Sequence, residues 1–292
     1  MYSYHACRGS SYVMAWNEMM DRSIGILPTA THSRIPHKEY RMTQDELFYL
    51  LFGSLPRQGP GCTAATRRAW KSLSSLPDRP RILDVGCGTG TQTRDLARLS
   101  AGSIIAVDNY RPFLRSVLEW VAREGARTRV CTLRASMDAL PFRNEAFDVI
   151  WSEGAIDIMG FAKGLAAWKP LCRRGGYLVI SDLTLFQSEP PAELLDFLKT
   201  YNVTLRTEEE KAGEIRDAGL LLLSTFRLDE AGWLEHFYEP MAEKIAALRP
   251  AVVSSPERAA VLDSLAREGE MYRKFRKWYG YTFYMIQRPD HD

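Results

Sequence analysis

The sequence lacks the features that mark secreted, metal-binding and membrane-spanning proteins. It has five cysteines in 292 residues, at positions 7, 62, 87, 131 and 172, odd in number and without CxxC spacing. We therefore expect no disulfide framework and no metal site, and a reducing cytoplasm as the compartment. Residues 1–25 lack a basic start followed by an apolar run, so no signal peptide is expected. No segment reaches the ~20 apolar residues that a membrane helix needs, so no membrane partner is expected.

An excess of charge is also missing. Lys and Arg total 38 and Asp and Glu total 36, a net charge of +2. A protein that binds nucleic acid electrostatically usually has a strong basic excess, so nucleic acid is not an expected partner. A basic run, Arg273 to Lys277, has aromatic residues interleaved and could contact RNA. A solvated helix face with its apolar stripe turned inward is the simpler interpretation.

What is present is an alternation of apolar strands and amphipathic helices in the first two thirds of the chain. Residues 1–43 show no sustained period and are interpreted as a partly ordered arm, and residues 44–292 as one domain. Strands are predicted at 81–86, 103–108, 129–133, 147–152 and 175–182, and helices at 44–52, 64–76, 91–99, from 112 to Gly125, and 161–171. Such apolar strands are buried on both faces, which predicts an α/β fold with a doubly wound, mostly parallel sheet.

The last third is organised differently. A helix at 191–199 precedes Thr207-Glu208-Glu209-Glu210, a capping box for a helix that reaches about Ala218. Strands are predicted at 220–228 and 280–288. Between them, residues 229–278 are interpreted as a mainly helical insertion, rich in aromatic residues, that caps the pocket for a substrate.

The strongest motif is LDVGCGTGTQT at 83–93, between a predicted strand and a predicted helix. Its glycines, Gly86, Gly88 and Gly90, allow a tight turn and the close approach of a ligand. Asp108 ends the next strand, 18 residues after Gly90. An acid at that place can accept hydrogen bonds from both hydroxyls of a ribose.

Two classes of cofactor use such a loop. A dinucleotide site needs GxGxxG, and Thr91 stands where its third glycine would be. Asp84 would also repel a pyrophosphate, whereas it suits a ligand with an ammonium group. S-adenosylmethionine (SAM) carries both an ammonium group and a ribose. The residues therefore favour SAM over NAD, and a glycine-rich turn without a ligand remains the plain alternative.

The motifs LDVGCGTG, SMDALPF, FDVIWSEGAI and GGYLVISD resemble those of the class I SAM-dependent methyltransferases, in the type 11 or UbiE-like group of small-molecule enzymes. Further stretches, RQGPG (57–61) and GYTFYMIQR (280–288) among them, resemble bacterial members of this group. The resemblance covers about residue 45 to the end. It implies a Rossmann-like sheet of seven strands whose last strand is antiparallel. It also implies that RQGPG covers the cofactor, with a turn leading into the domain as the alternative.

The resemblance places the cofactor along the loops. It implies that Asp84 and the loop 86–90 hold the methionine end, that Asp108 and Asn109 hold the ribose and adenine, and that residues 152–154 face the reacting methyl group. The predicted cofactor-binding residues are Arg57, Gly61, Asp84, Gly86, Cys87, Gly88, Thr89, Gln92, Asp108, Asn109, Ser136, Met137, Ser152, Glu153 and Gly154.

Two residues are candidates for catalysis. Glu153 follows the fourth strand, where it could act as a general base, orient the amino group of the cofactor, or merely cap a turn. His236 lies in GWLEHFYEP (232–240) and could take a proton from an acceptor, although most lone histidines are structural or exposed. Trp233, Phe237 and Tyr238 beside it could wall a pocket or pack as a helix face. Trp151 alternates with Phe147 and Val149 and is interpreted as core.

We therefore predict methyl transfer from SAM to a small-molecule acceptor, with S-adenosylhomocysteine as the product. The alternatives are an RNA or protein methyltransferase, a SAM-binding protein without catalysis, and an NAD-dependent oxidoreductase. The D/N-P-P-Y/F motif of enzymes that methylate amino groups of DNA bases is missing at 151–154. The sequence leaves open whether the protein is a monomer or a homodimer.

Overall fold

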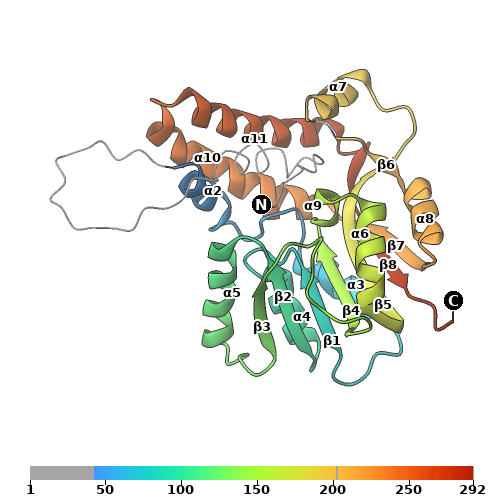
Figure 1. Cartoon of the computed structure of the whole chain (residues 1–292). Coiled ribbons are helices and arrows are strands. Elements are labelled where there is room, and N and C mark those ends of the chain that lie inside the picture. The colour runs from blue at the N-terminus through green and yellow to red at the C-terminus, as the bar shows by residue number, and fades with distance from the viewer. Residues whose placement is uncertain (1–42, 202, 292) are drawn as a thin grey trace, which may run out of the picture.

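A mixed β-sheet organises this computed structural model, which describes residues 43–201 and 203–291 (Figure 1). The predicted arm lies outside the described residues, except for Thr43. The strands are β1 (Arg81–Val85), β2 (Ser103–Asp108), β3 (Val130–Arg134), β4 (Phe147–Glu153), β5 (Cys172–Leu185), β6 (Arg206–Thr207), β7 (Leu221–Arg227) and β8 (Tyr279–Gln287). Their order is β3-β2-β1-β4-β5-β8-β7, and β6 pairs with β5 off this path.

The sheet confirms the predicted topology. Strands β1 to β5 pair in parallel, and β8 runs antiparallel to both β5 and β7. The two-residue strand β6 was not predicted, because two residues are too few to show an alternating pattern. Since β1, β2 and β4 are parallel, their carboxyl ends meet at one edge, which is where open α/β sheets bind ligands.

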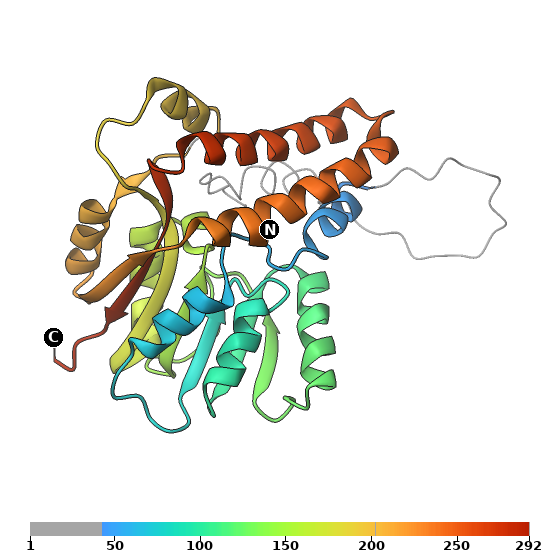
Figure 2. The same ribbon diagram turned by 180° about the vertical axis from the view of Figure 1, so that it is seen from behind.

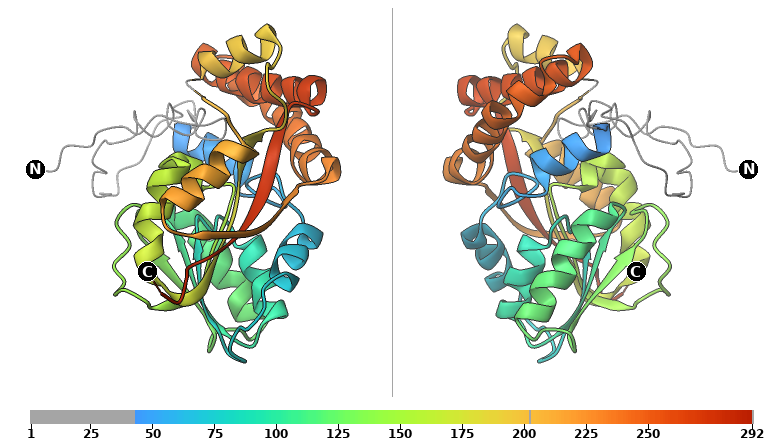
Figure 3. Two further views of the ribbon diagram at one scale, coloured as in Figure 1. Left: turned by 90° about the vertical axis from the view of Figure 1, so that its right-hand side faces the viewer. Right: turned by 90° about the vertical axis from the view of Figure 1, so that its left-hand side faces the viewer.

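Helices cover both faces of the sheet and its carboxyl-end edge (Figures 2 and 3). They are α2 (Gln44–Phe52), α3 (Thr63–Lys71), α4 (Thr91–Leu99), α5 (Arg111–Arg123), α6 (Phe161–Trp168), α7 (Ala192–Thr200), α8 (Glu208–Asp217), α9 (Glu230–Trp233), α10 (Glu239–Val252) and α11 (Pro256–Phe275), with the short turns Ile156–Ile158, Lys169–Leu171 and the π-helical Leu234–Tyr238. One core packs α3, α4 and α5 on the sheet, and a second packs α6 and α8 on the other face. No helix within residues 43–201 and 203–291 is long and apolar enough to cross a membrane.

Two local predictions were wrong. Helix α3 ends at Lys71, not Leu76, because Ser72 bonds back to the carbonyl of Ala69 through both its N–H and its hydroxyl. The residues Leu114, Val117, Leu118 and Val121 recur at i, i+3, i+4 and i+7, which predicts that they form the buried stripe of the helix from 112 to Gly125, yet Leu118 is 51% exposed. Trp120, a residue outside the predicted stripe, is buried in α5 instead.

The segment between β7 and β8 is helical, as predicted, and it covers the edge at which the strands end. Residue Gly61, between α2 and α3, donates its N–H to the carbonyl of Gly232 in α9 at 3.0 Å. Helix α10 also contacts α2. Of the cap helices, α9 and α10 therefore touch the segments that cover the site described next.

Candidate functional site

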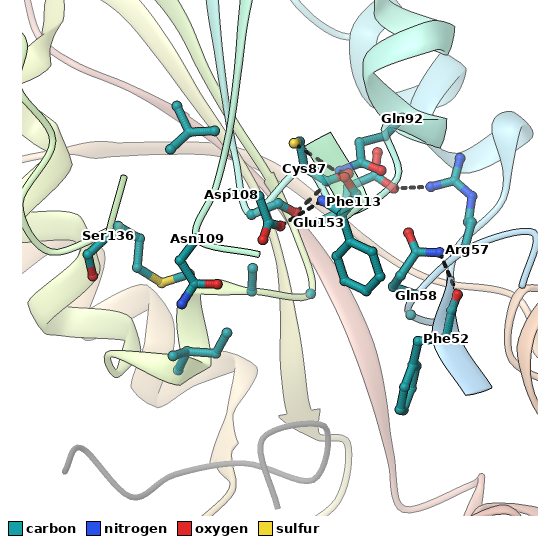
Figure 4. Close-up of a pocket in the computed structure, with 18 of the residues that line it drawn as sticks. Phe52, Arg57, Gln58, Cys87, Gln92, Asp108, Asn109, Phe113, Ser136 and Glu153 are labelled. Atoms are coloured by element: carbon teal, nitrogen blue, oxygen red, sulfur yellow. Dashed lines mark hydrogen bonds and ion pairs between the residues drawn. The ribbon is translucent and has the colours of Figure 1, made fainter. Parts of the chain in front are cut away.

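A pocket lies at the carboxyl ends of β1, β2 and β4, beneath α2 and the RQGPG segment (Figure 4). Eleven of the predicted cofactor residues line it: Arg57, Gly86, Cys87, Gly88, Gln92, Asp108, Asn109, Ser136, Met137, Glu153 and Gly154. Arg57 and Gln58 stand at one end, Asn109 and Ser136 at the other, and Asp108 lies between them. The pocket therefore gathers most of the predicted cofactor residues in one place, and the part of the cofactor that each would hold stays a prediction.

The glycine loop is fixed to the neighbouring strand β2. The N–H groups of Gly86 and Cys87 both donate to the carbonyl of Val107 at 2.9 Å. Gly86 has φ +73°, and a Cβ there would lie 2.5 Å from the Cβ of Ala155. Gly88 has φ +56°, and a Cβ there would meet Oε1 of Gln58 at 2.6 Å. The positive φ favours glycine at both positions, and at Gly86 a side chain would also collide with Ala155.

Asp108 joins the loop to β2 through its carboxylate. Its Oδ2 accepts the N–H of Gly88 at 2.9 Å and its Oδ1 accepts the N–H of Tyr110 at 2.8 Å. Burial raises the pKa of Asp108, while these backbone donors oppose the shift. Each carboxylate oxygen has a second lone pair, so the side chain can still accept from two hydroxyl groups in the pocket.

Asp84 lies behind the pocket wall. Its Oδ2 accepts from Thr93 Oγ1 at 2.5 Å, and its Oδ1 lies 3.4 Å from Nε2 of Gln92. Burial is the main cause that raises its pKa to about 7, and the nearby carboxylate of Glu153 adds to the shift. Gln92 lines the pocket and Asp84 does not, so Asp84 reaches the pocket only through Gln92, and its predicted contact with a cofactor stays a prediction.

Glu153 is held by three donors. Arg57 Nη1 donates to its Oε2 at 2.8 Å, and Thr66 Oγ1 and Trp151 Nε1 donate to its Oε1 at 2.7 and 2.9 Å. Its side chain is only 4% exposed. Arg57 also pairs with Asp95 at 3.1 Å, which makes one buried network. Because three donors already occupy this carboxylate, the geometry favours a positioning role for Glu153 over the general-base role.

The RQGPG segment closes over the glycine loop. Oε1 of Gln58 accepts both the N–H and the hydroxyl of Thr89 at 2.8 Å, and its Nε2 donates to the carbonyl of Phe52 at 3.0 Å. Gly61 packs against Arg57 and bonds to α9. Thr89 and Gly61 thus hold the cover in place, although neither lines the pocket.

Two other predicted residues lie away from the pocket. Ser152 is fully buried, and its hydroxyl donates to the carbonyl of Val85 at 3.0 Å, so it joins β4 to β1. His236 is exposed on the π-helical turn and does not line the pocket. Its predicted catalytic role finds no support here, because an exposed side chain outside the lining cannot meet an acceptor at Gly154.

Sequence reasoning missed the aromatic wall of the pocket. Phe48 and Phe52 come from α2 and Phe113 from α5, and Phe48 contacts both other rings. The capping box of Thr43 and Glu46 does mark where α2 begins. The motif indicates only a helix start, however, and does not indicate that the helix packs over the glycine loop. Among the described residues, no group of His, Cys, Asp and Glu side chains is arranged to hold a metal ion.

Comparisons with known proteins agree with this geometry. Residues 82–176 match the family described as "Methyltransferase domain". The chain is 28% identical over 152 residues to the uncharacterized methyltransferase YodH of Bacillus subtilis, a match that covers 52% of this chain and 64% of YodH. It is 30% identical over 135 residues to the ubiquinone/menaquinone biosynthesis C-methyltransferase UbiE of a Marinomonas species, over 44% of this chain and 52% of that one. Both matches thus span less than two thirds of the relative.

A solved structure shares the whole fold. The SAM-dependent methyltransferase of Geobacter sulfurreducens, in complex with S-adenosylhomocysteine, superposes with a TM-score of 0.70 at 18% identity, over 83% of this chain and 97% of that one. At that identity the likeness concerns the fold alone. Residues 82–176 therefore match a family of methyltransferase domains, and the chain shares its fold with a solved SAM-dependent methyltransferase.

Proposed function

We propose that the protein binds SAM in this pocket and transfers its methyl group to a small molecule. The observation that carries the proposal is the convergence of Gly86–Gly88, Asp108 and Gly154 on one pocket at the ends of three adjacent strands. The pocket residues fit this cofactor. Asp108 has free lone pairs for the ribose hydroxyls, and Asn109 and Ser136 lie at the end of the pocket where the base would bind.

The methionine end would lie toward Arg57, Gln58 and Gln92. SAM supplies an electrophilic methyl group on a sulfonium, which a nucleophilic atom of the acceptor attacks in line. The chain contributes position and the exclusion of water, which are the main sources of rate in such a displacement. Asp84, through Gln92, and Glu153, through its network, supply negative charge near the cofactor's ammonium group.

A small molecule is the proposed acceptor because the cover and the cap enclose the site. Gly61 of the cover bonds to α9, and α10 packs against α2, so a large substrate has little room above Gly154. The net charge of +2 also favours a small molecule over RNA. Fold alone does not name a substrate, so the acceptor must be found by experiment.

The test uses SAM with a deuterated methyl group, incubated with the purified protein and a fractionated extract of the source cells. Mass spectrometry then searches the small-molecule, RNA and protein fractions for the label. We expect a labelled small molecule that is missing when Asp108→Ala protein is used. Label in RNA or protein would contradict the small-molecule acceptor. Intact SAM binding without label in any fraction would favour a protein that binds SAM without catalysis.

A further inference from the structure

Beside the cofactor pocket lies a second feature, a group of aromatic rings around one buried acid. We call it the cap cluster, and it comprises Trp233, Tyr238, Glu268, Tyr272, Tyr279 and Tyr281. Trp233 stacks on Tyr272 with ring centroids 4.3 Å apart and lies 4.7 Å from the ring of Tyr281. The members come from α9, the π-helical turn, α11 and β8, so the cluster forms only when the cap packs on the sheet.

Two polar atoms of the cap cluster have no partner. Within residues 43–201 and 203–291, neither Nε1 of Trp233 nor Oε1 of Glu268 makes a hydrogen bond, although both atoms are buried. The two residues are only 2% and 4% exposed. Buried polar groups are nearly always paired, because an unpaired one loses its hydration without compensation. Two unpaired buried polar atoms in one cluster therefore indicate that a bound molecule forms their missing hydrogen bonds.

The cap cluster borders the cofactor pocket. Gly154 lines that pocket, and a Cβ on it would lie 2.8 Å from the hydroxyl oxygen of Tyr281. Gly232, next to Trp233, holds the cover segment through Gly61. Tyr281 thus connects the end of the pocket at Glu153–Gly154 to the rings around Glu268. A molecule held by the cap cluster would be adjacent to the place proposed for the methyl group.

The chemistry of the cluster selects a cation. The faces of Trp and Tyr rings carry negative potential and attract ammonium groups. Glu268 forms no ion pair with a described residue, and burial raises its pKa well above the ordinary value. Glu268 lies one turn before Tyr272 on α11, and a Cβ on the neighbouring Gly269 would lie 3.2 Å from the ring of Tyr238, which places this part of the helix against the rings. An ammonium ligand would supply the missing positive charge, and an oxygen atom on the same molecule could accept from Trp233 Nε1.

We propose that the cap cluster is the acceptor subsite, and that the acceptor carries an ammonium group that binds Glu268 together with an oxygen atom that binds Trp233. This inference rests on the proposed function and deepens it, since it names the chemical class of the acceptor.

The test compares two probes of the same shape that differ in charge, by calorimetry on protein saturated with S-adenosylhomocysteine. Choline carries a quaternary ammonium and a hydroxyl, and 3,3-dimethylbutan-1-ol is its neutral isostere. We expect choline to bind at least about tenfold more tightly. Glu268→Gln should remove this preference, whereas Trp233→Phe should weaken both probes, because each carries the hydroxyl that accepts from Trp233 Nε1. The control Glu270→Gln, on the exposed side of the same helix, should leave both affinities within about twofold.

A loss of choline binding in Glu268→Gln would not be caused by misfolding of this variant. Glu268→Gln removes a desolvated carboxyl that has no ion pair, so its melting temperature should equal or exceed that of the wild type. Equal affinities for the two probes, no binding of choline, or unchanged preference in Glu268→Gln would each overturn the subsite. Binding of S-adenosylhomocysteine is measured first in the same cell. If it binds and choline does not, the subsite is wrong and the cofactor site stands; if it does not bind, the proposed function itself fails.

Discussion

Arg57 and Glu153, 96 positions apart in the chain, form an ion pair of 2.8 Å in which both side chains are at least nine-tenths buried. The pair ties the segment above the pocket to the end of β4. Because Arg57 also pairs with Asp95 on α4, one guanidinium forms ion pairs with two buried carboxylates. The cover of the cofactor site is thus held by charge as well as by packing.

Removing Arg57 should destabilise the protein strongly. Arg57→Met keeps most of the aliphatic volume but leaves Glu153 and Asp95 buried without their cation, a type of change that costs about 3–5 kcal/mol. Chemical denaturation should show this loss in the free energy of unfolding. Arg67→Met, at an exposed position of α3, is the matched control and should change it by less than about 0.5 kcal/mol. Similar values for the two variants would show that the ion pair contributes little.

Replacing Glu153 tests its role as a positioning residue. Glu153→Gln can still accept from Thr66 and Trp151 but presents an amide to Arg57, which breaks the ion pair. We expect a lower melting temperature and weaker binding of SAM, with the pH dependence of kcat unchanged in shape. Loss of the acidic limb of the kcat profile in this variant, without loss of stability, would instead identify Glu153 as the general base.

Asp84 should make stability depend on pH. Its folded pKa is about 7, above the unfolded value near 3.8, so the native state holds the proton more tightly and loses stability as pH rises between these values. Asp84→Asn stays neutral and avoids this cost. The cofactor-free variant should therefore exceed the wild type at pH 8, by at most about 4 kcal/mol, with a gain that shrinks toward pH 4.

The measurement for Asp84 is denaturation of cofactor-free protein at several pH values, with Asp78→Asn, an exposed substitution, as the control. The same Asp84→Asn variant should bind SAM more weakly, because it lacks the charge behind Gln92. A stability difference that does not change with pH, or a loss of stability at pH 8, would refute the assignment.

The positions of the strands along the chain and of the glycine loop were predictable because both depend on local sequence, whereas the antiparallel last strand followed from the family resemblance. The strand 81–86 and the helix 91–99 carry clear apolar periods, and glycine at 86 and 88 has a local steric reason. The roles of Asp84 and Glu153 were only partly predictable. Their neighbours Thr93, Thr66 and Arg57 come from other elements, and no pattern in the sequence indicates which donor reaches which carboxylate.

The helical cap between β7 and β8 was also only partly predictable from the sequence. Its helical character follows from composition, but the exposure of His236 and the burial of Glu268 depend on which face of each helix meets the sheet. A charged residue on a helix is usually solvated, so sequence reasoning places Glu268 outside and gives it no role. Only the packing of α11 against β8 brings this acid among the tyrosines.

The most direct test of the cofactor site is a calorimetric titration of the purified protein with SAM, repeated with NAD and with two variants. We predict one SAM site per chain, no binding of NAD, and at least about hundredfold weaker SAM binding in Asp108→Ala, which loses the carboxylate for the ribose and the anchor of Gly88. Asp78→Ala should match the wild type. Undetectable binding of SAM to the wild type, or equal affinity in Asp108→Ala, would contradict the placement of the cofactor in this pocket.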